Sequence, residues 1–211
     1  MKTKLVCGVG INDAEYQVQK IGTDESTYWK CPFYMTWTGM LARAYSKVTQ
    51  RNQPTYKGCS VDERWHRFSD FRKWMETQDW EGKQLDKDFL VAGNKMYSPE
   101  TCVFVSQGVN STITDSGKAR GVYPLGVHRS KTKKESYVAC VRKNGAKIYL
   151  GSYPTPMEAH RAWQAAKIGS IESAVELNNE TCPRLLGAIV RLKCKLLADI
   201  EQGKETVSFH T

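Results

Sequence analysis

The stretch "YVACVRKNGAKIYLGSYPTPMEAHRAWQAA", residues 137–166, decides the fold expected for the second half of the chain. Its first part contains two runs rich in valine, tyrosine and isoleucine, and the Asn-Gly pair between them is a strong short-range signal for a β-hairpin. Just upstream, "GVHRSK" at 126–131 supplies another short strand. Pro156 then opens a helix, since proline is favoured in the first helical turn. The pattern predicts three short strands followed by a helix with one alanine-rich face: Ala159, Ala162, Trp163 and Ala166.

Positive charge is concentrated in the same part of the sequence. The 211-residue chain carries a formal net charge of +9, and residues 117–150 alone carry +8. That segment holds nine Lys and Arg residues against the single acidic residue Glu135. These charges alternate with Tyr, Val and Gly at a spacing typical of strands, which favours a surface that binds a polyanion over an ordinary solvated face.

The pattern "GVHRS…YVACVRKNGAKIYLGSYPTPMEAHRAWQAA" resembles the AP2/ERF family of DNA-binding domains over about 50 residues. The family shows a Gly-Val-Arg start, an aromatic-Val-Ala strand, and Leu-Gly-x-Phe-x-Thr before an alanine-rich helix. The resemblance implies a three-stranded antiparallel sheet that enters the major groove of double-stranded DNA, with the helix on its other face. The positions that match or nearly match are Gly126, Val127, Tyr137, Val138, Ala139, Arg142, Leu150, Gly151, Tyr153, Thr155, Glu158, Ala159, Ala162 and Ala166.

Simple alternation from Tyr137 puts Arg142 and Lys143 on opposite faces of their strand, so both cannot enter the groove. By resemblance to the family, we expect Tyr137, Arg142 and Tyr149 to read bases, with His128 and Arg129 in place of the usual arginine pair. Lysines position a protein on phosphates without specifying sequence. The expected phosphate contacts are Lys131, Lys133, Lys134 and Lys143, and Lys147 completes the expected DNA-binding set.

The first half of the chain is predicted to contain two amphipathic helices, over 33–47 and 62–76, because apolar residues recur there at three- and four-residue steps. The segment "QLDKDFLVAGNKMYSPETCVFVSQGVNS", residues 84–111, follows. It predicts strands over 83–90 and 101–106 joined by a Gly- and Pro-containing loop, and then the start of a helix.

Residues 1–113 resemble phage HNH-type proteins related to homing endonucleases, which often carry an AP2-like domain. "TCVFVSQGVN" aligns without gaps on the Asn-Leu-Glu-Trp-Val…Asn segment of many HNH fingers, although Thr101 replaces the structural Asn. The usual Asp-His pair becomes Asp86-Lys87. The resemblance implies that Asp86 and Asn110 hold Mg²⁺ or Mn²⁺ beside a scissile phosphate.

The expected catalytic residues are therefore Asp86, Lys87, Asp88 and Asn110. Lys87 would stabilise the phosphorane, because a protonated amine does not readily activate water, and Asp88 would serve as a second ligand or as the base. The alternative is that Asp86 and Asp88 are polar strand-end residues and that Asn110 caps a helix.

The seven cysteines, an odd number without a CxxC pair, favour reduced thiols and exclude a secreted disulfide framework. A zinc site built from Cys31, Cys59, Cys102 and His66 is less favoured than buried thiols, since the spacing is irregular. No run approaches the ~20 apolar residues of a membrane span, and the start lacks a signal-peptide cleavage region, so we expect a cytoplasmic protein without a membrane partner.

The predicted fold class is α+β, with an HNH-like module at 1–113, a linker at 114–121, an AP2-like domain at 122–175, and a C-terminal helix and tail at 176–211, the helix spanning about 183–203. The predicted function is a metal-dependent endonuclease that cuts double-stranded DNA where its AP2-like domain binds, and the oligomeric state stays open. The alternative is a non-catalytic DNA-binding regulator. RNA binding is less favoured, because a groove-reading sheet suits B-form DNA better than A-form RNA.

Overall fold

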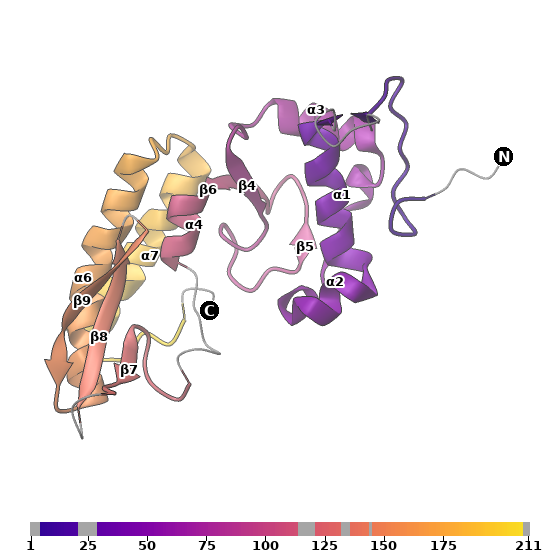
Figure 1. Cartoon of the computed structure of the whole chain (residues 1–211). Helices are drawn as coiled ribbons and strands as arrows, with labels where there is room; N and C mark the ends of the chain where they lie inside the picture. The colour runs from indigo at the N-terminus through magenta and orange to yellow at the C-terminus, as the bar shows by residue number, and fades with distance from the viewer. Residues whose placement is uncertain (1–4, 21–28, 114–120, 132–135, 144, 209–211) are drawn as a thin grey trace. The chain divides into compact units, whose positions relative to one another are not determined.

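The computed structural model describes residues 5–20, 29–113, 121–131, 136–143 and 145–208 (Figure 1). These residues form a mixed α+β structure with small sheets and several helices, which confirms the fold class at that level. The chain divides into two compact units, Met1–Phe104 (unit 1) and Val105–Thr211 (unit 2). From the sequence we expected a boundary after residue 113. The structure divides the units after Phe104 instead, so the helix over 107–113 belongs to unit 2. Of the expected linker, only Gly121 lies within the described residues.

Unit 1 begins with two short antiparallel strands, β1 (Gln19–Lys20) and β2 (Trp29–Lys30), followed by helices α1 (Pro32–Tyr45) and α2 (Lys47–Asn52). After the 3-10 turn η2 (Pro54–Tyr56), strand β3 (Ser60–Val61) pairs in parallel with β5 (Met96–Tyr97). The 3-10 turn η3 (Glu63–Trp65) precedes helix α3 (Phe68–Glu76). Strand β4 (Lys83–Asp86) pairs with β6 (Val103–Ser106), which runs across the division between the units.

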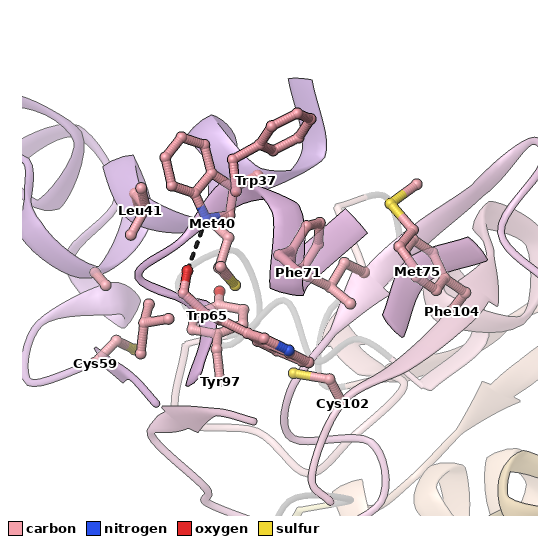
Figure 2. Packing of buried hydrophobic residues seen from close by; sticks show 14 of the residues in the cluster. Trp37, Met40, Leu41, Cys59, Trp65, Phe71, Met75, Tyr97, Cys102 and Phe104 are labelled. Atoms are coloured by element: carbon pink, nitrogen blue, oxygen red, sulfur yellow. Dashed lines mark hydrogen bonds between the residues drawn. The ribbon is translucent and has the colours of Figure 1, made fainter. Parts of the chain in front are cut away.

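Aromatic side chains fill the core of unit 1 (Figure 2). Trp37, Trp65, Phe71 and Tyr97 are each at most 1% exposed. The indole N–H of Trp37 donates to the main-chain carbonyl of Trp65 at 2.7 Å, which satisfies the polar end of a large apolar side chain. The rings of Trp65 and Phe71 meet edge to face, with their centroids 5.2 Å apart. This packing holds α1, η3 and α3 together.

The helix expected over 33–47 is confirmed by α1, but the helix expected over 62–76 is interrupted. Arg67 is extended, with φ −91° and ψ 133°, and separates η3 from α3. The N-terminal segment accounts for the break. The N–H of Ile11 donates to the carbonyl of His66 at 2.8 Å, and the N–H of Phe68 donates to the carbonyl of Ile11 at 3.0 Å. Residues 66–68 therefore pair with a distant strand-like segment instead of continuing the helix.

Unit 2 contains helix α4 (Gln107–Ile113), a three-stranded antiparallel sheet in the order β7 (Val127–Arg129), β8 (Tyr137–Lys143), β9 (Ala146–Tyr153), and helices α6 (Pro156–Leu177) and α7 (Pro183–Glu201). The order of strands and helices expected from the sequence is confirmed. Thr155 begins α6 with a capping box: its side chain accepts from the N–H of Glu158, and the Glu158 carboxylate accepts from the N–H of Thr155.

Helix α6 covers one face of the sheet (Figure 1) and packs against it through a small core of Val127, Ala139 and Ala159. Gly126, just before β7, has φ +76° and lies directly against the indole of Trp163. A Cβ at this position would lie 1.9 Å from Trp163 Cδ1, so only glycine allows both the left-handed backbone and the close approach.

The buried side of α6 also carries polar groups with specific partners. His160 Nδ1 donates to the carbonyl of Leu125 at 2.9 Å, and its Nε2 accepts from the N–H of Thr206 at 3.0 Å. One turn further on, the amide of Gln164 donates to the carbonyl of Lys204 and to the hydroxyl of Thr206, each at 3.0 Å. These bonds hold the segment after α7 against α6.

None of the helices in the described parts of the chain is long and apolar enough to cross a membrane.

Candidate nucleic-acid interface

The face of the sheet that points away from α6 carries cationic, polar and aromatic side chains. Residues facing the helix are identified by burial: Val127, Ala139 and Val141 are each at most 4% exposed. Their strand neighbours point the other way, because side chains alternate along a strand. The register places His128 opposite Val138 and Arg142 opposite Lys147 on this outer face. We call this surface the open face of the sheet.

A β-bulge in β9 changes which side chains reach the open face. The register shifts between Ala139 and Cys140, which pair with Gly151 and Tyr149, so Leu150 is the extra residue of β9. Leu150 packs against the core beside Ala139, while Tyr149 is 61% exposed. The hydroxyl groups of Tyr149 and Ser152 lie 2.9 Å apart in a hydrogen bond on the outer side. Alternation from Lys147 already puts Tyr149 on the outer side and Leu150 on the inner side, and the bulge then places Ser152 outward and Tyr153 toward the core.

The open face is cationic, and its charges act on one another. Burial lowers the pKa of His128, and the positive charges of Lys147 and Lys131 lower it further. These effects favour the neutral imidazole of His128, which can both donate and accept a hydrogen bond, whereas Arg142 and Lys147 carry positive side chains. Arg142 is exposed, and its guanidinium donates to the carbonyl of Gly145 at 3.5 Å.

The structure brings some of the expected DNA-binding residues together and separates others. His128, Arg142, Lys147 and Tyr149 share the open face. Tyr137 does not: it packs against the core on the α6 side and meets Tyr123 edge to face at 5.5 Å. Arg129 is paired with Tyr137 and is exposed, Lys143 is exposed opposite Ala146, and Lys131 is exposed beyond β7. Lys133, Lys134 and the Asn144 of the expected turn lie outside the described residues.

Ser152 belongs to the open face but was not among the expected residues. Strict alternation from Tyr149 puts it on the other side. The signal that identifies it is Gly151, whose φ of +139° marks the irregularity in the strand. Glycine inside a strand pattern often indicates a bulge. A bulge shifts every later side chain to the opposite face, and Ser152 follows from that shift.

The expected catalytic segment forms a tight turn at the end of β4. Asp86 Oδ1 accepts from the N–H groups of Asp88 at 2.9 Å and Phe89 at 2.7 Å, an arrangement that ends the strand. The strand expected over 83–90 therefore stops at Asp86. Burial raises the pKa of Asp86 to about 6, and the neighbouring carboxylate of Asp88 adds to the shift. Two carboxyl groups thus adjoin within one turn.

Lys87 points into unit 1, with 5% of the residue exposed. Its ammonium donates to Asp88 Oδ2 and to the carbonyl of Asn94, both at 3.0 Å, and lies 6.0 Å from the centre of the Tyr97 ring. Asn94 returns two bonds, from its amide nitrogen to the carbonyls of Lys87 and Met96, each at 2.6 Å. These bonds hold the 86–96 loop together, and they fit a structural role for Lys87 better than a contact with a phosphate.

The oxygen ligands expected for a metal ion are divided between the two units. Asp86 and Asp88 supply two carboxylates in unit 1, whereas Asn110 lies half-buried on α4 in unit 2. Mg²⁺ is commonly bound through one or two carboxylates plus substrate phosphate, so the pair in unit 1 fits this ion. Among the described residues, no cluster of three or more His, Cys, Asp or Glu side chains is placed to hold a metal. Cys31, Cys59 and Cys102 are free thiols buried in the core of unit 1.

The sequence matches no family model, and no curated protein or solved structure is significantly similar to the chain.

Proposed function

We propose that this protein binds double-stranded DNA by placing the open face of the β7–β9 sheet in the major groove, as its resemblance to AP2/ERF domains implies. The observation that carries the proposal is the grouping of His128, Arg142, Lys147 and Tyr149 on the face that α6 leaves uncovered. A two- or three-stranded ribbon fits the width of the major groove. On this proposal Arg142 would make a bidentate contact with guanine, and the exposed Lys131 and Lys143 would contact phosphates.

A comparison of Arg142→Ala with Lys143→Ala tests this assignment. A bidentate Arg–guanine contact contributes about 1–3 kcal/mol of discrimination between bases. We therefore expect Arg142→Ala to narrow the ratio of affinities for a selected target duplex and a scrambled duplex by about five-fold or more. Lys143→Ala should weaken both duplexes by a similar factor and reduce the dependence of affinity on salt. Arg142→Lys should restore only part of the discrimination, because a point charge lacks the planar fork.

The measurement is a binding titration at two salt concentrations, on a target first enriched from random duplexes. Lys57→Ala, an exposed lysine on unit 1, is the matched control and should leave target preference unchanged. If Arg142→Ala weakened the target and the scrambled duplex equally, Arg142 would be a backbone contact and the sheet would not read bases.

Metal-dependent cleavage of the bound DNA is a second candidate function, carried by the two carboxyl groups of Asp86 and Asp88 in one turn of unit 1. It corresponds to the HNH-like, homing-type phage endonuclease that the sequence resembles. Asp86 and Asp88 would hold Mg²⁺ or Mn²⁺, which would polarise a phosphate oxygen when bound. The rival is a regulator that binds DNA without cutting it.

A plasmid-nicking assay in Mg²⁺ or Mn²⁺ separates the two. Asp86→Asn is the informative variant, because its amide oxygen can still accept from the N–H groups of Asp88 and Phe89 and so keep the turn. Nicking that disappears in Asp86→Asn and in Asp88→Asn, with DNA binding intact, supports the endonuclease. Tight binding without nicking in either metal supports the regulator.

A further inference from the structure

Unit 1 has an open hollow of about 650 Å³ that neither the sheet nor the Asp86 turn uses. Its lining residues come from the segment before β1, from β1 and from β2: Tyr16, Gln17, Lys20 and Trp29. Lys20 and Trp29 are direct cross-strand partners in the β1–β2 pair, so they lie side by side. Cavities that bind small ligands span about 300–1,000 Å³, and this hollow falls within that range.

The two aromatic rings of the hollow are exposed to an extent unusual for their size. Tyr16 is 41% exposed and Trp29 is 45% exposed, whereas Trp37 and Trp65 in the same unit are at most 1% exposed. Leaving a large ring in water forgoes the free energy gained by burying it, so clustered exposed aromatics indicate a binding surface more often than isolated ones do. The hollow therefore combines two available rings with the amide of Gln17 and the ammonium of Lys20.

The neighbouring packing holds the Tyr16 ring and the Trp29 backbone in place. The hydroxyl of Tyr16 lies 3.8 Å from the thiol sulfur of Cys31, and the guanidinium of Arg72 lies 5.1 Å from the centre of the Tyr16 ring. Arg72 is itself held by Glu76 at 2.6 Å. Next to Trp29, the N–H of Cys31 donates to the carbonyl of Val18 at 2.8 Å, which ties the strand to the core. The Tyr16 ring and the Trp29 backbone are therefore pre-positioned, which lowers the entropy lost when a ligand binds.

We propose that this hollow binds one unpaired nucleotide of single-stranded DNA, with its base stacked on Trp29 and Tyr16 and its phosphate at Lys20. Aromatic rings beside a cation are the components of sequence-tolerant single-strand binding, because every base has a face to stack and every nucleotide a phosphate. A base inside a duplex is covered by its neighbours and cannot stack on a protein ring. The hollow thus selects melted or single-stranded DNA, whereas the sheet of unit 2 selects the duplex.

The choice of DNA as the polymer rests on the proposed function. The residues of the hollow lie in unit 1, however, and none of them belongs to the open face of the sheet in unit 2. A free nucleotide shares the same chemistry. The experiment therefore uses an oligothymidylate, an abasic oligodeoxynucleotide of equal length, and thymidine monophosphate as separate probes, all with the full chain.

We expect Trp29→Ala to weaken oligothymidylate binding by about five-fold or more, since stacking on a single ring has that size of effect. Trp29→Phe keeps a ring and should retain most of the affinity. Lys20→Ala should weaken the binding of both oligomers, whereas Trp29→Ala should change the affinity for the abasic oligomer little. Lys73→Ala is the matched control, because its side chain is 77% exposed in the same unit and lies outside the hollow.

Each outcome has a distinct meaning. Binding of thymidine monophosphate as tightly as the oligomer would make the hollow a free-nucleotide site and overturn the DNA assignment. Equal binding of oligothymidylate by wild type and Trp29→Ala would overturn the site itself. The same pair of variants is repeated in the Arg142→Ala background: loss of duplex discrimination with retention of the Trp29 effect shows that the hollow acts whether or not the sheet reads bases.

Discussion

Units 1 and 2 have interiors of different chemistry. The core of unit 1 is built mainly from aromatic rings, and its buried polar contacts include the indole N–H of Trp37 on the carbonyl of Trp65 and the ammonium of Lys87 on the carbonyl of Asn94. Helix α6 of unit 2 instead buries His160, Gln164, Lys167 and Ser170, each at most 5% exposed. Gln164 and His160 hold the segment after α7, and Lys167 donates to the carbonyl of Thr112 on α4. One unit is held mainly by apolar packing, and the other also depends on specific polar bonds.

Because of this difference, we expect the two units to respond differently to substitution. Apolar packing tolerates a shape-conserving substitution, because the hydrophobic effect has no direction. A buried hydrogen bond has direction, and losing one partner leaves the other without water or protein to satisfy it. Unit 2 should therefore be the more sensitive of the two to substitutions that conserve volume but remove a polar atom.

The largest effect is expected from Gly126→Ala. The new Cβ would collide with the Trp163 ring and would also force a left-handed backbone on alanine, so we expect a loss of about 2–5 kcal/mol in the stability of unit 2. Gly121→Ala is the control: its φ is +71° but its Cβ would meet nothing, so only the backbone cost of about 1–2 kcal/mol applies. Hydrogen exchange followed by mass spectrometry localises the loss. Equal loss of protection in unit 1 would contradict the division into separately stabilised units.

His160→Phe tests the polar interior directly. The ring stays, but the carbonyl of Leu125 and the N–H of Thr206 lose their partner, which should cost about 2–4 kcal/mol. Trp37→Phe in unit 1 is the matched change, because it removes one buried donor bond and leaves the Trp65 carbonyl unpaired. Urea denaturation of both variants gives the comparison. A smaller loss in His160→Phe than in Trp37→Phe would show that the His160 bonds add little.

Alkaline pH should move the two units in opposite directions. Burial lowers the pKa of Lys167 to about 8, so above pH 8 the folded state releases a proton that the unfolded chain still holds, and unit 2 gains stability, about 2 kcal/mol by pH 9.5. Burial raises the pKa of Cys102 to about 12, so above pH 9 only the unfolded chain ionises, and unit 1 loses stability.

Urea unfolding at pH 7 and at pH 9.5 gives the free energy of unfolding at each pH, and the difference between the two values measures each change in stability. Lys167→Met should remove the alkaline gain, and Cys102→Ala should remove the alkaline loss. If the difference in unfolding free energy between wild type and Lys167→Met stayed constant from pH 7 to pH 9.5, Lys167 would titrate in the folded protein as it does in the unfolded chain.

The smallest effect is expected from Thr155→Ala at the start of α6. It removes the side-chain bond to the N–H of Glu158, which should cost about 1 kcal/mol, and Thr155→Ser should retain nearly all of it. The thermal unfolding midpoint of unit 2 provides the measurement. An effect as large as that of Gly126→Ala would mean that α6 depends more on its cap than on its packing against the sheet.

The open face was partly predictable from sequence. Arg142 was placed on the face away from Ala139 by alternation alone, and its register with Lys147 follows from the hairpin. Resemblance to a family led us to expect Tyr137 on the face that reads bases. Alternation from Ala139 puts Tyr137 on the buried face, where the structure has it. Lys87 was expected from the sequence to stabilise a phosphorane, but its amine is buried, and Asp88 and the carbonyl of Asn94 replace water around it.

The sequence by itself determined the features that depend on neighbours a few residues away. The strand order β7-β8-β9, the start of α6 at Pro156 and the aromatic faces of α1 and α3 follow from turn chemistry and hydrophobic periodicity, which act locally. Only the tertiary structure decided the break before Phe68 and the requirement for glycine at 126. Both depend on a partner far away in the chain (Ile11 and Trp163), and no local pattern specifies which distant group will meet the backbone.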